Sequence, residues 1–229
     1  MCGRYTVFTE AEIIEMNAIV AEVSRRFGSG AVATGEIFPT NVAPILMMEN
    51  NRLAPFPVFW GFPKWDKGVN INARSDTALN PELAETPGRA RWIRENFTKP
   101  LLARRCVIPS TGFYEWTFVK AYDPQISLFP DEEAPPSPKD PKMKLHFKRP
   151  GESMLYMAGM LTTFADASGT AKDAFCILTT DAKHSIARFH DRMPVILSPG
   201  ECEDWIASEA FMREVLARDG PDLDWKPAA

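Results

Sequence analysis

Short strand-like runs separated by turns fill the middle of the sequence, and they restrict the fold more than any other feature. Such runs are expected at Pro44–Met48, Pro55–Trp60, Val69–Asn72, Cys106–Ile108, Gly112–Phe118, Met143–Lys148, Met154–Thr162, Ala174–Thr180 and Pro194–Leu197. Apolar residues at helical spacing predict helices over about residues 10–26, 89–97, 181–189 and 199–218. Together these runs predict an α+β fold whose core is an antiparallel, partly closed, barrel-like β-sheet with peripheral helices.

The first helix carries a start signal of its own. Thr9 and Glu12 have the spacing of a capping box, in which each side chain accepts a hydrogen bond from a backbone N–H of the first turn. Apolar residues follow at helical spacing from Ile13 to Phe27. The pattern therefore predicts a helix from about residue 10 to residue 26.

One domain is expected over residues 1–229, because a chain of this length with 45% hydrophobic residues has enough apolar side chains for one core. The segment 121–141 is acidic and rich in proline, which predicts an exposed insertion. The net charge of −4 is unevenly distributed, since residues 121–141 carry −4, residues 201–229 carry −5 and the remainder carries +5. The basic stretch over residues 89–105 is typical either of a groove that binds phosphates or of a solvated helix face.

Several classes of protein are disfavoured by what the sequence lacks. No apolar run reaches the roughly 18 residues of a membrane span, and the N-terminus does not resemble a signal peptide. The four cysteines form no C-x-x-C pair, which excludes the common zinc ribbons, and no P-loop, G-x-G-x-x-G or H-E-x-x-H motif occurs. We therefore expect no metal, no nucleotide cofactor and no membrane partner.

Cys2 is informative because of its position. Removal of Met1 would leave an α-amine and a thiol on the same residue. The pKa of an α-amine lies near 7.7–8.0 against about 10.4 for lysine, so its free-base fraction at neutral pH is roughly 300-fold larger. Such an amine attacks an aldehyde to give a Schiff base, and the neighbouring thiol closes a five-membered thiazolidine ring. The alternative is an incidental small residue at a frayed terminus.

Three further clusters contain residues suited to chemistry. Asn72-Ala73-Arg74 ends a strand-like run, where asparagine orients a reactive group and arginine binds phosphate. Glu115 lies among the aromatic residues of Gly112-Phe113-Tyr114-Glu115-Trp116, and is either solvent-facing or desolvated with a raised pKa. His190 opens His190-Asp191-Arg192-Met193-Pro194 and is either structural or an acid–base residue.

Taken in order, these motifs resemble the SRAP family (SOS response-associated peptidase), also described as abasic-site processing proteins. The resemblance rests on Met1-Cys2-Gly3-Arg4-Tyr5, Asn41-Val42-Ala43-Pro44, Trp60-Gly61, Asn72-Ala73-Arg74, Arg105-Cys106-Val107-Ile108-Pro109, Gly112-Phe113-Tyr114-Glu115-Trp116 and His190-Asp191-Arg192-Met193-Pro194. It covers the chain from residue 2 to about residue 207. Each motif is weak alone, but their joint order is specific. One departure is Asp76, which stands where the family often has glutamate.

The resemblance implies a substrate and a set of roles. The substrate is single-stranded DNA with an abasic site, to which the protein crosslinks through a thiazolidine at Cys2. Asn72 would orient the nucleophile or the opened sugar, Glu115 would transfer protons, and His190 would act at the ring-opened deoxyribose. Arg4 and Arg74 would hold phosphates, and Pro44 and Trp65 would pack on bases. Cleavage on the 3′ side of the lesion, a monomer, and a cytoplasmic, nucleoid-associated location in a bacterium are also expected.

Two other functions stay open at the level of the sequence. Cys2, His190 and Asn72 are the residue types of a Cys-His-Asn triad, which would support a thiol peptidase or autopeptidase. A non-catalytic protein that binds single strands and shields lesions is the second. Crosslinking needs a free Cys2 amine, whereas a peptidase tolerates an extended one, and binding alone survives the substitution Cys2→Ser.

Overall fold

The computed structural model describes residues 3–64, 68–118, 141–165 and 168–228. Its six α-helices are α1 (Ile14–Phe27), α2 (Ser75–Leu79), α3 (Pro87–Ile93), α4 (Lys99–Ala103), α5 (Cys202–Ala207) and α6 (Glu209–Ala217). A π-helical segment, Arg94–Thr98, joins α3 to α4, and short 3₁₀ helices occur at Pro81–Leu83, Ile186–Arg188 and Pro199–Glu201. No helix in the described ranges has the length and hydrophobicity needed to cross a bilayer. The insertion expected at 121–141 lies almost wholly outside these ranges.

Five strands close into a ring that forms the centre of the fold. In ring order they are β12 (Ala171–Asp181), β4 (Arg52–Trp60), β3 (Val42–Glu49), β8 (Arg105–Ser110) and β11 (Leu155–Ala165), and β11 pairs with β12 to complete the circuit. Shorter strands β7 (Asn72–Arg74), β13 (Arg192–Pro194) and β14 (Ile196–Leu197) add to β12 and β11. Most pairings are antiparallel, but β4 and β7 both run parallel to β12.

A second sheet of five antiparallel strands packs against this barrel. Its order is β15 (Asp224–Pro227), β10 (Lys142–Lys148), β9 (Gly112–Phe118), β1 (Arg4–Val7) and β2 (Gly35–Ile37). The core joins the two sheets through Tyr5 of β1, whose ring meets the edge of Trp60 at 5.0 Å, and Trp60 in turn stacks on Phe175. A two-stranded hairpin, β5 (Phe62–Pro63) with β6 (Val69–Asn70), follows the barrel strand β4. The α+β, barrel-like fold expected from the sequence is confirmed.

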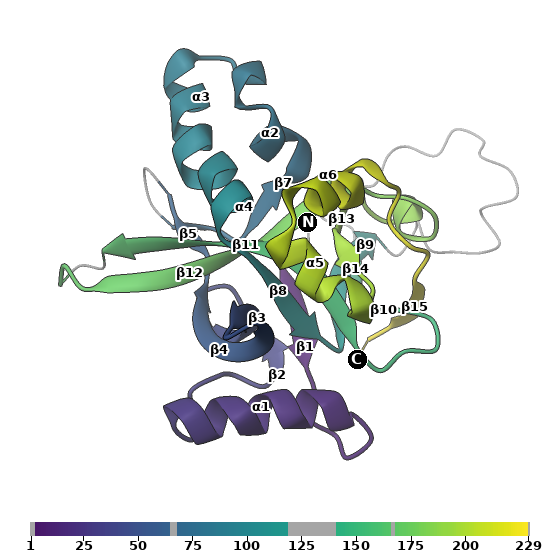
Figure 1. Cartoon of the computed structure of the whole chain (residues 1–229). Helices are drawn as coiled ribbons and strands as arrows, with labels where there is room; N and C mark the ends of the chain where they lie inside the picture. The colour runs from purple at the N-terminus through teal and green to yellow at the C-terminus, as the bar shows by residue number, and fades with distance from the viewer. Residues whose placement is uncertain (1–2, 65–67, 119–140, 166–167, 229) are drawn as a thin grey trace, which may run out of the picture.

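The helices lie around the periphery of the barrel (Figure 1). The long helix α1 lies beside β3 and β4, α2 to α4 cluster at the opposite end, and α5 and α6 cover a third side. Trp205 of α5 is buried, and its indole N–H donates to the carbonyl of Cys106 at 3.0 Å. Trp60 is buried as well, in agreement with the sequence.

Two local expectations were wrong. The helix α1 begins at Ile14 without a side-chain cap, because residues before it form a turn in which Ile13 N–H donates to the Glu10 carbonyl, so Thr9 and Glu12 make no capping box. The helix expected at 181–189 is reduced to Ile186–Arg188, since β12 extends to Asp181 and His184 has a φ of 51° that a helix does not accept.

The basic stretch at 89–105 does not form one surface. The guanidinium of Arg105 is buried and donates to the backbone carbonyls of Leu101, Leu102, Trp205 and Ile206. It therefore ties α4 and α5 to the barrel strand β8. Arg104 instead forms an ion pair with Asp173 of β12 at 3.1 Å. Neither arginine lines the cleft described below, whereas Arg89 does.

Candidate functional site

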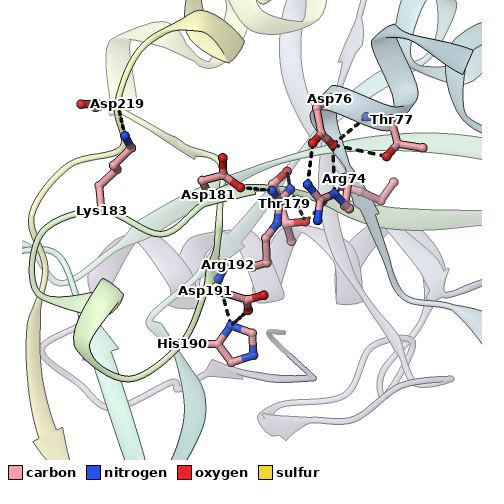
Figure 2. A network of polar contacts seen from close by, with 11 residues as sticks. Arg74, Asp76, Thr77, Thr179, Asp181, Lys183, His190, Asp191, Arg192 and Asp219 are labelled. Carbon is pink, nitrogen blue, oxygen red and sulfur yellow. Dashed lines mark hydrogen bonds and ion pairs between the residues drawn. The ribbon is translucent and has the colours of Figure 1, made fainter. Parts of the chain in front are cut away.

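The end of β12 brings two distant segments together. On one side β7 pairs in parallel, with Asn72 opposite Ile177 and Arg74 opposite Thr179. On the other side β13 pairs in antiparallel register, with Arg192 opposite Asp181. The clusters around residues 72–74 and 190–194 therefore flank the same strand end, which accounts for the polar network in Figure 2.

Arg192 fixes the position of the second cluster. Its side chain is buried, and its guanidinium forms an ion pair with Asp181 at 2.5 Å and donates to the Thr179 carbonyl at 2.6 Å. Charge-assisted hydrogen bonds of this kind are stronger than neutral ones. The three residues hold the start of β13, and with it the preceding loop, against the end of β12.

His190 has two alternative partners at one ring nitrogen. Its Nδ1 accepts a hydrogen bond from the backbone N–H of Arg192 at 2.9 Å, and it also lies 2.7 Å from Asp191 Oδ1 (Figure 2). The first contact requires a bare Nδ1, and the second requires a proton there. Burial lowers the pKa of His190, which favours the neutral ring bonded to Arg192. Protonation thus exchanges one partner for the other, as an acid–base residue requires.

Glu115 is the buried acid of the site. It lies on β9 between its neighbours in the five-stranded sheet, opposite Leu145 of β10. Only 3% of its surface is exposed. Burial raises its pKa to about 7, and the negative charge of Asp191 adds to the rise. The desolvated alternative weighed for Glu115 is therefore the one found, and the carboxyl titrates in the range where it both donates and accepts protons.

A cleft of about 780 Å³ opens beside β7. Its lining consists of Lys64, Asn70, Asn72, Ala73, Arg74, Thr77, Gly88, Arg89, Trp92 and Phe97. Three cationic side chains and two aromatic rings thus face one space, together with the two asparagine amides. This composition is suited to a ligand that presents both phosphates and flat rings.

Arg74 at the edge of this cleft is held by a carboxylate. Its guanidinium forms two hydrogen bonds with Asp76, at 3.1 and 2.6 Å, and about half of each side chain is exposed. The Arg74 guanidinium lowers the pKa of Asp76 to about 2, so the pair is ionised at neutral pH. A half-exposed pair of this kind is weak, which leaves Arg74 available to a stronger anion.

Comparison with known proteins assigns the chain to a family. A family model described as SOS response associated peptidase (SRAP) matches residues 1–227. The chain belongs to this family. It is 31% identical to the abasic site processing protein YoqW of Bacillus subtilis over 90% of this chain and 80% of that protein. It is 24% identical to the abasic site processing protein YedK of Escherichia coli over 100% of this chain and 92% of that protein.

The fold of this SRAP protein also occurs in solved structures. A crystal structure of a Bacteroides thetaiotaomicron protein superposes with a TM-score of 0.69 and 21% identity, covering 100% of this chain and 92% of the other. A Bordetella bronchiseptica protein gives a TM-score of 0.69 at 18% identity, with 100% of both chains covered. These likenesses show the fold, which agrees with the resemblance noted in the sequence.

The residues expected to act in a SRAP site fall into separate groups. Asn72 and Arg74 line the cleft, and Glu115 and His190 share the neighbourhood of Asp191. Arg4 is opposite Tyr114 in the sheet, so its side chain points to the face of β9 that Glu115 does not use.

Three of the expected residues gain no support from the described structure. Pro44 is buried in β3 opposite Pro57, so its contact with a base stays a prediction. Cys2 and Trp65 lie outside the described residues, and their roles stay predictions as well.

The cleft contains residues that sequence reasoning missed. Lys64 comes from the end of the β5 strand, Asn70 from β6, Trp92 from α3 and Phe97 from the π-helical segment. Arg89 had been weighed within the basic stretch and proves to be the member of it that lines the cleft. The basic stretch at 89–105 was the signal in the sequence that pointed to this cleft, because a helix that carries arginines beside aromatic residues is suited to a nucleic-acid surface.

The three described cysteines are not candidates for a nucleophile. Cys106, Cys176 and Cys202 are all buried, as the sequence suggested for the first two. Burial raises the pKa of Cys202 to about 12 and that of Cys106 and Cys176 still further, so their thiols stay protonated. No group of three or more metal-ligating side chains occurs within the described ranges.

Proposed function

We propose that this chain binds single-stranded DNA containing an abasic site and crosslinks to it through a thiazolidine at Cys2, once Met1 is removed. The observation that carries the proposal is the buried Glu115, whose pKa is raised to about 7 on a strand directly beside β1. The names of the relatives YoqW and YedK as abasic site processing proteins support the substrate class.

Chain connectivity supports the choice of Cys2. Two peptide units separate Cys2 from Arg4, which limits the distance between their Cα atoms to about 7 Å. Arg4 in turn is directly opposite Tyr114, the residue before Glu115. Chain connectivity therefore allows the proposed reaction, which needs the amine and thiol of a processed Cys2 near this acid.

The chemistry balances without a cofactor. The α-amine adds to the aldehyde carbon of the ring-opened deoxyribose, and loss of water gives an imine. The thiol sulfur then adds to the imine carbon, and its proton passes to the nitrogen. The net reaction joins one aldehyde and one aminothiol and releases one water. Glu115 serves each proton transfer, because its carboxyl is close to half ionised at pH 7.

His190 and Asn72 act on the sugar. The abasic sugar is mainly a closed hemiacetal, and opening it requires a proton at the ring oxygen and removal of one from the hydroxyl. His190 is suited to this step because its Nδ1 exchanges partners between Arg192 N–H and Asp191 on protonation. Asn72, at the wall of the cleft beside Arg74, supplies amide groups that orient the opened sugar.

The cleft suits a single strand. Lys64, Arg74 and Arg89 provide cations for successive phosphates, and Trp92 and Phe97 provide rings on which unpaired bases stack. A single strand enters such a space without the unpairing that a duplex would need. The imine intermediate also permits β-elimination, so some strand cleavage on the 3′ side of the lesion accompanies crosslinking.

The test is a denaturing gel and an intact mass of the protein mixed with abasic single-stranded DNA. The wild-type protein, shown by mass to lack Met1, is expected to give a heat-stable adduct whose mass is the sum of the two molecules less one water. Cys2→Ser keeps the amine but not the thiol, so it is expected to give only an imine that borohydride traps. Cys2 preceded by one extra residue is expected to give no thiazolidine, because the free α-amine and the thiol are then on different residues.

Other outcomes decide against the proposal. If processed wild-type protein forms no adduct but binds the DNA with the same affinity as Cys2→Ser, the protein only shields the lesion. If no adduct forms and a peptide is cleaved in a manner that requires Cys2 and His190, the protein is a thiol peptidase. The crosslinking function is overturned in either case.

A further inference from the structure

The face of the five-stranded sheet that turns away from the barrel carries a second set of cations and rings. Residues directly opposite each other in neighbouring strands share a face. The row Arg4, Tyr114, His146 and Lys226 crosses four strands in this way. We call this surface the outer face; its members are Arg4, Thr6, Glu36, Gly112, Tyr114, Trp116, Phe118, Lys142, Lys144, His146, Lys148, Asp224 and Lys226.

Cations on the outer face lie over aromatic rings. Lys144 Nζ is 4.0 Å from the centre of the Tyr114 ring, and Lys142 Nζ is 4.9 Å from that of Phe118. The guanidinium of Arg4 lies 4.0 Å above Phe38, an exposed ring just beyond β2, and 5.2 Å from Trp116. Tyr114 is buried, but Phe38 is exposed and Trp116 and Phe118 are partly exposed, and rings that are open to solvent stack on nucleobases.

The outer face is basic, although the chain as a whole is acidic. Five lysine and arginine side chains stand against two carboxylates, those of Glu36 and Asp224, whereas the chain carries −4. Glu36 is shared between Arg4 and Lys144. Within the described part of the chain, Lys142, Lys148 and Lys226 form no ion pair, so their charges are available to an anionic ligand.

A hollow of about 360 Å³ ends this surface at β10 and β15. It is lined by His146, Lys148, Arg149, Gly151, Glu152, Asp224, Trp225 and Lys226. Arg149 is paired with Glu152 at 3.4 Å, which leaves Lys148 and Lys226 as the unpaired cations at the hollow. The row from Arg4 to Lys226 covers three interstrand spacings, about 15 Å, and its two middle members, Tyr114 and His146, are buried. The rings near Arg4 and the hollow therefore lie on either side of these two residues.

We propose that the outer face binds a second segment of single-stranded nucleic acid, outside the cleft that takes the lesion. Phosphates lie on Lys142, Lys148 and Lys226, and unpaired bases stack on Phe38, Trp116 and Phe118. A single strand is favoured over a duplex because stacking on these rings needs bases whose faces are free. The inference rests on the proposed function only in naming DNA as the strand, since the outer face does not include Asn72, Glu115 or His190.

The experiment compares oligonucleotides of two lengths. Undamaged oligothymidine of about 30 nucleotides reaches both surfaces, whereas an abasic oligonucleotide of about 6 fills only the cleft. The variant Lys142→Ala/Lys148→Ala/Lys226→Ala is measured beside Lys99→Ala/Lys172→Ala/Lys183→Ala, which removes the same charge elsewhere. The first variant is expected to weaken binding of the long strand by about tenfold. It is also expected to reduce the slope of log K against log[salt] by the equivalent of about two phosphate contacts. Binding of the short strand is expected to stay unchanged.

The outcomes separate this proposal from the proposed function. Loss of affinity that is equal for both lengths, or equal for both lysine triples, overturns the outer face as a binding site. So does failure of the wild-type protein to bind the long undamaged strand, whether or not the short abasic strand forms an adduct. The exposed double variant Lys142→Glu/Lys226→Glu repeats the test if replacing the half-buried Lys148 disturbs folding, and it is expected to weaken long-strand binding further.

Discussion

Glu115 and the residues on either side of it in β9 point to opposite faces of the sheet, so their surroundings differ. The Glu115 side chain points toward the barrel and is 3% exposed, while Tyr114 and Trp116 point to the outer face. On the barrel side, burial raises the pKa of this acid to about 7. On the outer face, Lys144 lies over the Tyr114 ring and pairs with Glu36.

The contrast shows how one strand supports two kinds of contact. Burial converts a permanent charge into a proton donor and acceptor, which suits covalent chemistry. Partial exposure preserves charge, which suits reversible contact with phosphates. The alternation of a strand is therefore enough to separate the proposed acid from the proposed binding surface by the thickness of one sheet.

The largest expected effect comes from removing the acid on the barrel side. Glu115→Gln keeps the shape but cannot exchange a proton, so the rate of adduct formation is expected to fall by about 10²–10⁴. Quench-flow sampling on denaturing gels measures it, and the rate should also lose its inflection near pH 7. Unchanged affinity for undamaged DNA is the control. A variant that crosslinks at the wild-type rate would remove Glu115 from the chemistry.

Glu115 also affects stability in a predictable direction. Its pKa is about 7 in the folded chain against an ordinary 4.5, so between these values the folded state holds a proton that the unfolded state has released. Stability contributed by this group therefore falls as pH rises from about 4.5 to 7, by roughly 2–4 kcal/mol. Urea unfolding at pH 4 and pH 8 should show Glu115→Gln gaining that amount relative to wild type. Parallel pH curves would contradict the buried, protonated acid.

His146 on the outer face is expected to act in the opposite direction. Burial, aided by the charges of Lys148, Lys226 and Lys144 and opposed by Glu36, lowers its pKa from 6.5 to about 4. Stability is therefore lost as pH falls through this range, by roughly 2–4 kcal/mol. The ring lies against Thr6 and Tyr114, and Gln preserves a polar group near Thr6 Oγ1. Relative to wild type, His146→Gln should gain stability between pH 7 and pH 4, and a curve that keeps the wild-type slope would contradict the neutral buried ring.

The smallest effects are expected from replacing the carboxylates that pair with cations in the cleft and on the outer face. Asp76→Asn releases Arg74 in the cleft, and Glu36→Gln releases Arg4 and Lys144 on the outer face. Each is expected to tighten single-strand binding several-fold while changing stability by less than about 1 kcal/mol, because the pairs are partly exposed. Asp76→Asn should act on short and long strands alike, whereas Glu36→Gln should act on long strands alone. The reverse pattern would show that the two surfaces have been assigned the wrong way round.

The sequence predicts the barrel strands but misses three of the five strands of the second sheet, β1, β2 and β15. Runs such as Cys106–Ile108 and Ala174–Thr180 are found as parts of β8 and β12, because apolar and β-branched residues between turns have few alternatives. The sequence did not decide which face of the sheet the Glu115 side chain occupies, because aromatic residues precede and follow it. Only the pairing of β9 with β1 and β10 puts Tyr114 on the outer face and Glu115 toward the barrel.

The cleft depends on contacts that local sequence patterns do not predict. Four of its lining residues belong to elements that meet only in the folded chain. They are Lys64 of the hairpin, Arg74 of β7, Arg89 of α3 and Phe97 of the π-helical segment. In the same way Asp181, the last residue of β12, was assigned to a helix, because its ion pair with Arg192 joins residues eleven apart in the sequence. Spacing in the sequence carries no signal for such contacts.

The central place of β1 in its sheet has a consequence for the order of events during synthesis. Thr6 of this strand pairs with Gly112, which follows it by 106 residues. At about 5–20 residues per second, Gly112 is made roughly 5 to 20 s after Thr6. Throughout that interval β1 lacks the neighbour that carries Glu115. Under the proposed function, Met1 would be removed in this interval, before β9 is made.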